Sequence, residues 1–446
     1  MAKNKILRPA RLIAAVAVAA ALALTGCSSG SAGSGGSAGS SLLTPQKVPS
    51  AKSTLTVWSF MPGNFDNGKA AYDKVVAGFE KKYPQVDVKL VSVPYNSYFD
   101  QVRNATVARK GPDVITMYGG AQAYSYHNGL QPLQKAMEPD IEKNLEFVKD
   151  SYSQDGNLYS IPTGAYAYSL IVNQSLFEKA GIDPQQGLSD WSNLLDTCKT
   201  MASKGIQPMA SAWKDGFMFE TYMYMISSQM MDSPTLTKWI NGKLPVDDKI
   251  FTAATNYVLQ LEKAGCFGTK QNLGLGLNMY DDAFNQFYSG KAAMLASGSL
   301  STAATATKTV PSTTVIRLPQ VPESKYTQIA DGGGDAGWSV TKWTKQPAAA
   351  VAFVNYMAGP EAQKILWDMV QEPPNLKNLQ VSGSTPAQDA MLKIIQDPEN
   401  HTGFMAFPLT VLSVYERNAS SLIGGSMSSQ TFTAQAQSAW AQTMKQ

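Results

Sequence analysis

The chain has 446 residues, with 37 Lys and Arg, 34 Asp and Glu and 2 His, so its formal charge is +3. This length fits about two domains, and the plentiful Leu, Val, Ala and aromatic residues predict a mostly globular chain. So small a charge argues against a nucleic-acid-binding protein, which carries a clustered basic face. Three cysteines are too few for a disulfide scaffold or a Cys-rich zinc module. Two histidines leave little room for a metal site built from histidine. We therefore expect neither a bound metal nor another cofactor.

Residues 1–26 have the pattern of an export signal. A basic start precedes an apolar run of 13 residues, Leu12 to Leu24, which is too short for a permanent membrane span but fits a secretory signal. Leu24-Thr25-Gly26-Cys27 follows and resembles the lipobox of bacterial lipoproteins, which predicts that Cys27 is diacylated and becomes the mature N-terminus. The alternative is a plain signal peptide that happens to contain a cysteine.

Removal of this leader changes the charge of the chain. It takes away four positive charges and no negative ones, so the remaining balance is 33 minus 34, or −1. Residues 27–51 are then mostly Gly, Ser and Ala, followed by Thr, Pro and Lys, and cannot build a core. We expect them to form a flexible tether between a membrane lipid and a globular body.

From residue 52 the pattern alternates between strands and helices. The first predicted elements are a strand at 55–58, a helix ending at Pro84, a strand at 86–93, a helix at 97–109 and a strand at 113–117. This order and spacing predict a parallel sheet with helices on its faces. Later elements are helices at 191–201, 217–231 (apolar nearly all round), 283–288, 347–357 and 360–369, a strand at 291–296 and amphipathic segments at 409–418 and 431–444.

Four stretches are similar to signatures of one protein family. They are 161–182, which contains Asn173-Gln174-Ser175-Leu176-Phe177-Glu178-Lys179-Ala180-Gly181, then 188–191 with Trp191, 287–294 with Gly290-Lys291-Ala292-Ala293-Met294, and 348–363 with Gly359-Pro360-Glu361. In these stretches the chain resembles the family 1 extracellular solute-binding proteins of ABC importers, which include the maltose-binding proteins. Gly298-Ser299-Leu300 stands where the family often has Gly-Pro-Trp, so a sugar-stacking tryptophan is missing there.

The resemblance implies a two-lobed α/β fold of the periplasmic-binding-protein kind, with hinge-crossing strands and a central ligand cleft. It places the first lobe at 52–163 and 336–370 and the second at 164–335 and 371–446. It also implies a monomeric receptor, not an enzyme, that closes on a carbohydrate and delivers it to permease subunits of an ABC importer. With Cys27 lipidated, the protein would stand on the outer face of the membrane of a Gram-positive bacterium.

Ligands of open α/β sheets bind beyond the carboxyl ends of the strands. Aromatic faces complement the C–H faces of sugars, and Asp, Asn and Tyr side chains hydrogen-bond their hydroxyls. The expected ligand-binding residues are Trp58, Phe60, Asn64, Tyr95, Tyr118, Gly119, Tyr166, Tyr168, Trp213, Phe217, Asp335 and Trp338. Trp213 is included because its irregular segment predicts exposure; for Trp58, Tyr118 and Trp338 a core role is the alternative.

Two further patterns carry weaker expectations. Gly332, Gly334 and Gly337 match G-x-G-x-x-G, but a strand pattern follows where a nucleotide site needs a helix, so we expect a hinge crossing instead. A bridge between Cys198 and Cys266 is permitted outside the cell. Cys198 lies on an apolar helical stripe, and because nothing in the sequence shows that the two cysteines approach each other, we expect two buried thiols.

Other functions remain open on the sequence alone. The same fold could bind a neutral solute other than a sugar. A strongly charged ligand would need several Arg or Lys in the cleft, and no expected site residue is basic, which favours a neutral ligand. A secreted glycoside hydrolase would need two carboxylates flanking the bond, and Asp335 is the only expected one. An adhesin without transport is the remaining alternative.

Overall fold

The computed structural model describes residues 42–443, except 66, 154, 166, 233–234, 236–237, 239–244, 246–248, 327–335, 378 and 398–408. Leu42–Gln446 forms one compact unit. The predictions for the leader, Cys27, Tyr166, Gly332, Gly334 and Asp335 therefore lie outside the described residues. Val48 is buried and Leu43 packs against the core, so the chain joins the globular body before residue 51, the predicted end of the tether.

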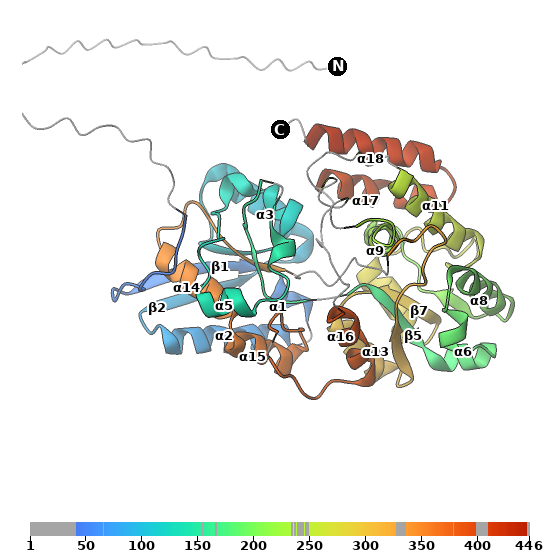
Figure 1. Cartoon of the computed structure of the whole chain (residues 1–446), viewed down its shortest axis with the longest axis horizontal. Helices are drawn as coiled ribbons and strands as arrows, with labels where there is room; N and C mark the ends of the chain where they lie inside the picture. The colour runs from blue at the N-terminus through green and yellow to red at the C-terminus, as the bar shows by residue number, and fades with distance from the viewer. Residues whose placement is uncertain are drawn as a thin grey trace, which may run out of the picture. The chain divides into compact units, whose positions relative to one another are not determined.

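The first lobe is built on a five-stranded sheet in the order β2-β1-β3-β9-β4, of which Figure 1 labels β1 and β2. As the sequence predicts, β1 is parallel to β2 and β3, whereas β9 is antiparallel to β3 and β4. The strands are β1 (Ser53–Ser59), β2 (Val86–Ser92), β3 (Val114–Met117), β4 (Ile161–Pro162) and β9 (Gly337–Val340).

Helices cover this sheet through apolar stripes. In α2, Tyr72, Val75 and Phe79 are buried at helical spacing. Pro360 starts α15 directly after α14 because its fixed φ suits a first helical turn. The helices of this lobe are α1 (Met61–Asn64), α2 (Gly68–Lys82), α3 (Tyr95–Ala108), α4 (Gly120–Tyr124), α5 (Pro139–Asn144), α14 (Pro347–Ala358) and α15 (Pro360–Val370).

The second lobe is built on a four-stranded sheet in the order β6-β7-β5-β8. Every residue of β5 and β7 is buried, as expected for apolar strands covered on both faces. β5 is antiparallel to β7 and β8, and β6 is parallel to β7. The strands are β5 (Ser169–Asn173), β6 (Gln207–Met209), β7 (Ala292–Ser297) and β8 (Thr313–Ile316).

Helix α9 (Phe217–Ser227) lies at the centre of the second lobe, and ten of its residues are buried. It contacts α11, α17 and β7, and α17 and α18 pack side by side over it (Figure 1). The other helices of this lobe are α6 (Gln174–Ala180), α7 (Pro184–Gly187), α8 (Trp191–Ser203), α11 (Lys249–Lys263), α12 (Phe284–Tyr288), α13 (Leu300–Thr309), α16 (Pro386–Ile395), α17 (Leu409–Ile423) and α18 (Ser429–Thr443). Within the described part of the chain, no helix combines the length and apolar character that a membrane span requires.

The segments that run between the sheets lie against one another. The Ala165 N–H donates to the Pro373 carbonyl (3.2 Å) and the Asn375 side chain donates to the Pro162 carbonyl (3.1 Å). At Gly337 an added Cβ would lie 2.2 Å from the Ile161 carbonyl oxygen, so only glycine allows β9 to approach β4 this closely. The described glycine of the G-x-G-x-x-G pattern thus serves strand packing near the crossing.

The structure corrects the prediction for the two cysteines. Cys198 of α8 and Cys266 form a disulfide, with their Cα atoms 4.8 Å apart. Gly265, with φ of 77°, ends α11 and reverses the chain, and Met209 of β6 donates to the Cys266 carbonyl. This turn places Cys266 beside α8, a tertiary contact that the helical stripe alone does not reveal.

Candidate functional site: a cavity between the lobes

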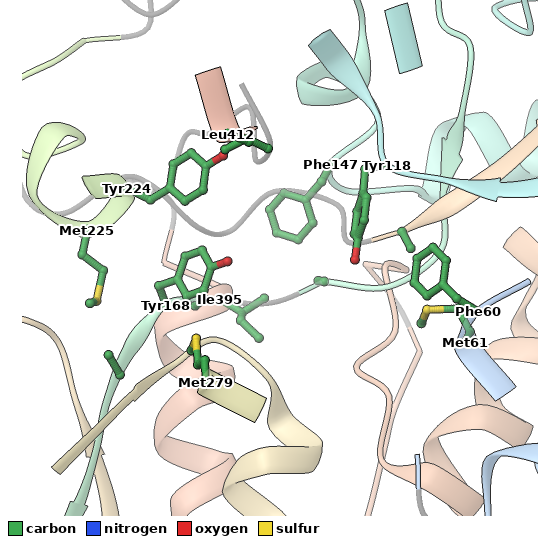
Figure 2. Close-up of a cluster of buried hydrophobic side chains, with 14 of the residues drawn as sticks. Phe60, Met61, Tyr118, Phe147, Tyr168, Tyr224, Met225, Met279, Ile395 and Leu412 are labelled. Atoms are coloured by element: carbon green, nitrogen blue, oxygen red, sulfur yellow. The ribbon is translucent and has the colours of Figure 1, made fainter. Parts of the chain in front are cut away.

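A cavity of about 600 Å³ lies between the two lobes. Figure 2 places Tyr118 with Phe60 and Met61 on one side and Tyr168 with Tyr224 and Met279 on the other. The residues that line it are Met61, Gly63, Asn64, Phe65, Pro94, Tyr95, Tyr118, Ala165, Tyr168, Phe217, Glu220, Thr221, Met279, Tyr280, Asp281, Phe284, Ser297, Gly298, Ser299, Thr302, Gln371, Glu372 and Pro373.

The first lobe contributes the residues that follow its parallel strands. Asn64 follows β1, Tyr95 follows β2 and Tyr118 follows β3. The ring of Phe60 packs behind them, with centroids 5.1 Å from Tyr95 and 5.6 Å from Tyr118. Because the carboxyl ends of parallel strands share one sheet edge, these side chains form a single wall.

The second lobe contributes three segments. The first turn of α9 carries Phe217, Glu220 and Thr221, and a π-helical turn (Met279–Ala283) carries Tyr280. The end of β7 runs into α13, where the Ser299 side chain accepts a hydrogen bond from the Thr302 N–H (3.5 Å). These segments place aromatic rings and short polar side chains opposite the wall of the first lobe.

The lining contains three carboxylic acids, Glu220, Asp281 and Glu372, and no Lys, Arg or His among the described residues. The Tyr72 hydroxyl donates to Glu372 Oε2 (3.2 Å). Burial raises the pKa of Glu220 to about 8, against the lowering effect of a hydrogen bond from Tyr224. The site is therefore suited to neutral or cationic ligands and would repel anions.

Five expected residues line the cavity, namely Asn64, Tyr95, Tyr118, Tyr168 and Phe217. Contact with a ligand stays a prediction for all five. Phe60 and Gly119 are buried behind the lining, and a Cβ at Gly119 would lie 2.7 Å from that of Ser151. Trp58 is half-buried and does not line the cavity.

The prediction that Trp213 is exposed is wrong, because its side chain is 0% exposed. Its indole N–H donates to Ser211 Oγ (2.8 Å), and its ring packs against Phe267 with centroids 4.7 Å apart. Trp338 is 1% exposed in β9 and packs on Phe353. Neither tryptophan reaches the cavity, so both are core residues.

Sequence reasoning missed Glu220, Tyr280, Asp281, Phe284, Ser299 and Glu372. One signal was available, because Glu220 is the only charged residue in the apolar run 217–231. A lone acid in such a helix requires a partner or a function. Of the others, Phe284 begins α12, and the rest lie in turns and crossing segments, where no periodicity points toward a cavity.

The chain matches the family of bacterial extracellular solute-binding proteins over residues 62–364, more than half of its length, and belongs to this family. It is 27% identical to the melibiose/raffinose/stachyose-binding protein MelE of Bacillus subtilis over 184 residues, which are 41% of this chain and 42% of MelE. It is 24% identical to the multiple sugar-binding protein of Streptococcus mutans over 332 residues, 72% of this chain and 75% of that protein.

The solved structure of a chitin oligosaccharide binding protein superposes with a TM-score of 0.75 at 20% identity, covering 89% of this chain and 100% of that one. This similarity confirms the two-lobed α/β fold, and the family match confirms the resemblance found in the sequence. The chain spans about half the length of the first curated relatives that it matches.

Proposed function

We infer that the protein is a receptor that binds a carbohydrate, of mono- to oligosaccharide size, between its lobes and delivers it to permease subunits of an ABC importer. The observation that carries this proposal is the aromatic lining of the cavity, which combines rings from both lobes with short polar side chains. The rings are Phe65, Tyr95, Tyr118, Tyr168, Phe217, Tyr280 and Phe284. Apolar ring faces beside hydroxyl-bonding groups are what a neutral sugar requires.

The named relatives support the same ligand class, since MelE and the multiple sugar-binding protein are both described as binding sugars. The family consists of binding proteins, and we infer that this chain likewise catalyses no reaction. A matched assay checks this: each oligosaccharide that binds should be recovered intact after prolonged incubation with the protein.

We place the first lobe at 52–163 and 336–370 and the second at 164–335 and 371–446. The two sheets and the helices packed on each support this division. The crossing segments meet through the paired Gly164 and Pro374, and closure about them would bury a ligand in the cavity. Only the closed form would then dock productively on the permease.

We further infer that Cys27 carries the lipid that holds this protein, as a monomer, on the outer face of a Gram-positive cell membrane. The lipobox pattern at 24–27 supports the anchor. Cys27→Ser should abolish incorporation of labelled palmitate and release the protein into the medium. Retention of label and of membrane association by this variant would contradict the proposal.

The binding function is tested by a thermal-shift screen of the purified protein against mono-, di- and oligosaccharides. A ligand that binds only the native state stabilises it by RT ln(1 + [L]/Kd), about 2.7 kcal/mol at a hundredfold excess over Kd. We expect at least one sugar to raise the melting temperature. A shift with an anionic solute and with no sugar would overturn the proposal.

A further inference from the structure

A second cavity, of about 500 Å³, adjoins the first between the lobes. The two cavities share one wall, formed by Tyr95, Phe217, Glu220, Tyr280 and Asp281. A ligand held against the aromatic rings of the first cavity could therefore extend a substituent past Glu220 into the second.

The second cavity differs from the first in charge. Its lining has one basic residue, Arg103, which pairs with Asp100 on the same helix (2.7 Å). Four carboxylic acids line the cavity from the opposite lobe: Asp215, Glu220, Asp281 and Glu416. Because Arg103 is the only basic residue of the described lining and is already paired, none remains to neutralise these acids. The cavity therefore has an excess of acidic side chains on one side.

The structure disfavours the charged form of several of these acids. Burial raises the pKa of Asp215, Glu220 and Glu416, and repulsion among these acids adds to the effect. Arg417 lowers the pKa of Glu416, and backbone N–H groups lower the pKa of Asp215. Neither influence cancels the rise. A cation in the cavity would offset the cost of burying the charged forms of these acids and would reduce the repulsion among them.

Two residues that line this cavity from opposite lobes carry a buried acceptor atom. Glu220 is 5% exposed and Gln122 is 2% exposed. In the described part of the chain, neither Glu220 Oε1 nor Gln122 Oε1 has a hydrogen-bond partner. Buried acceptors without partners are rare in native structures, so these two atoms point to a hydrogen-bond donor supplied by a ligand.

We propose that the second cavity is a subsite for a protonated amino group, so that the carbohydrate ligand carries a basic nitrogen. This proposal rests on the proposed function and narrows its ligand class to amino sugars and amine-bearing oligosaccharides. An ammonium group donates hydrogen bonds and brings positive charge, whereas a hydroxyl supplies only the donor. A metal ion fits less well: among the described residues, no group of three or more His, Cys, Asp or Glu could hold one.

The test compares sugars that differ only in whether C2 of each ring carries a hydroxyl or an amino group. The pairs are glucose and glucosamine, galactose and galactosamine, and cellotetraose and fully deacetylated chitotetraose, titrated calorimetrically into the purified protein at pH 7. We expect the amine member of at least one pair to bind tenfold or more tightly than its hydroxyl counterpart. The preference should shrink as salt is added, because a charge contact is screened.

Variants test whether the preference for the amine sugar arises in the second cavity. Glu220→Gln keeps the shape of the side chain but removes the carboxyl group that can ionise beside a bound cation, and should bring the affinity ratio of the pair close to one. Glu416→Gln, a second variant in the same cavity, should lower that ratio by a smaller factor. The control is Glu178→Gln on α6, an exposed acid of the same lobe, which should leave the ratio unchanged; thermal melts check that each variant is folded.

The outcomes separate this proposal from the function on which it rests. If hydroxyl sugars bind and no amine counterpart binds more tightly, the amine subsite is overturned and carbohydrate binding stands. If no sugar of either kind binds, both are overturned. An amine preference that survives both Glu220→Gln and Glu416→Gln would also overturn the assignment to this cavity.

Discussion

The ring of Tyr95 lies edge-on to the ring of Phe217, with centroids 6.2 Å apart and 65° between the ring planes. Tyr95 begins α3 in the first lobe and Phe217 begins α9 in the second. Both rings line both cavities. The contact thus joins the lobes at the place where we propose that the ligand binds, and it makes binding and lobe closure depend on the same side chains.

Phe217→Ala should therefore weaken sugar binding at least tenfold, which corresponds to about 1.4 kcal/mol. The variant loses a stacking surface for the sugar and the contact with Tyr95, and aromatic pairs contribute about 0.5–1.5 kcal/mol beyond their buried area. Calorimetric titration measures the effect. Tyr83→Ala, a half-buried aromatic at the end of α2 away from both cavities, is the control; equal affinity for both variants would contradict the assignment.

Trp213→Ala should destabilise the ligand-free protein by about 3–5 kcal/mol, the usual range for an aromatic residue removed from a core. Its ring is fully buried against Tyr222 and Phe267. Urea unfolding measures the change, and Trp213→Phe should retain part of the stability. A loss below about 1 kcal/mol for the alanine variant would show that the side chain is not a core residue.

Reduction of the Cys198–Cys266 disulfide should also lower the stability of the protein. The two residues are 68 apart in sequence, and closing a loop of that length in the unfolded chain is worth up to about 4 kcal/mol. Denaturation with and without a thiol reductant measures the loss. The double variant Cys198→Ala, Cys266→Ala should be insensitive to the reductant; a wild-type protein equally insensitive would argue against the bridge.

Glu220 predicts a pH dependence of stability. Burial raises its pKa in the folded protein to about 8, from an ordinary value of 4.5. Between these values the folded state holds a proton that the unfolded state has lost, so the contribution to stability is fully present below about pH 4.5 and declines as pH rises through 8. The slope from one such group reaches about 1.4 kcal/mol per pH unit.

The check is urea unfolding at intervals from pH 5 to pH 8. Glu220→Gln should flatten the decline, because the amide does not titrate, whereas Glu178→Gln should retain it. Asp215 and Glu416, whose pKa values are also raised by burial, add declines of the same sign. A wild-type protein whose stability rises over this range would contradict the assignment.

Local sequence patterns correctly predicted the helices and strands that are determined by residues close together in the chain. The stripe of Tyr72, Val75 and Phe79 placed α2 correctly, and the rule for strand ends brought Asn64, Tyr95 and Tyr118 to the cavity. These successes share a cause, because helix periodicity and parallel strand order are themselves local signals.

The failures depend on contacts between distant segments. Trp213 is buried because Ser211 to Trp213 packs against the loop at Gly274, where an added Cβ would lie 2.2 Å from the Ser211 carbonyl oxygen. The disulfide could not be predicted for the same reason, because its two cysteines are distant in sequence and approach only through the turn at Gly265. The aromatic and acidic residues at Tyr280 and Asp281 could not be predicted either, because they come from a turn without periodicity.

The most direct measurement is calorimetric titration of a carbohydrate panel, neutral and amine-bearing, into the wild-type protein and into Phe217→Ala. The cavity between the lobes predicts that at least one sugar binds the wild-type protein at a single site and that the variant binds it at least tenfold more weakly. Binding of no sugar, or binding of equal strength to the two proteins, would contradict a carbohydrate site between the lobes.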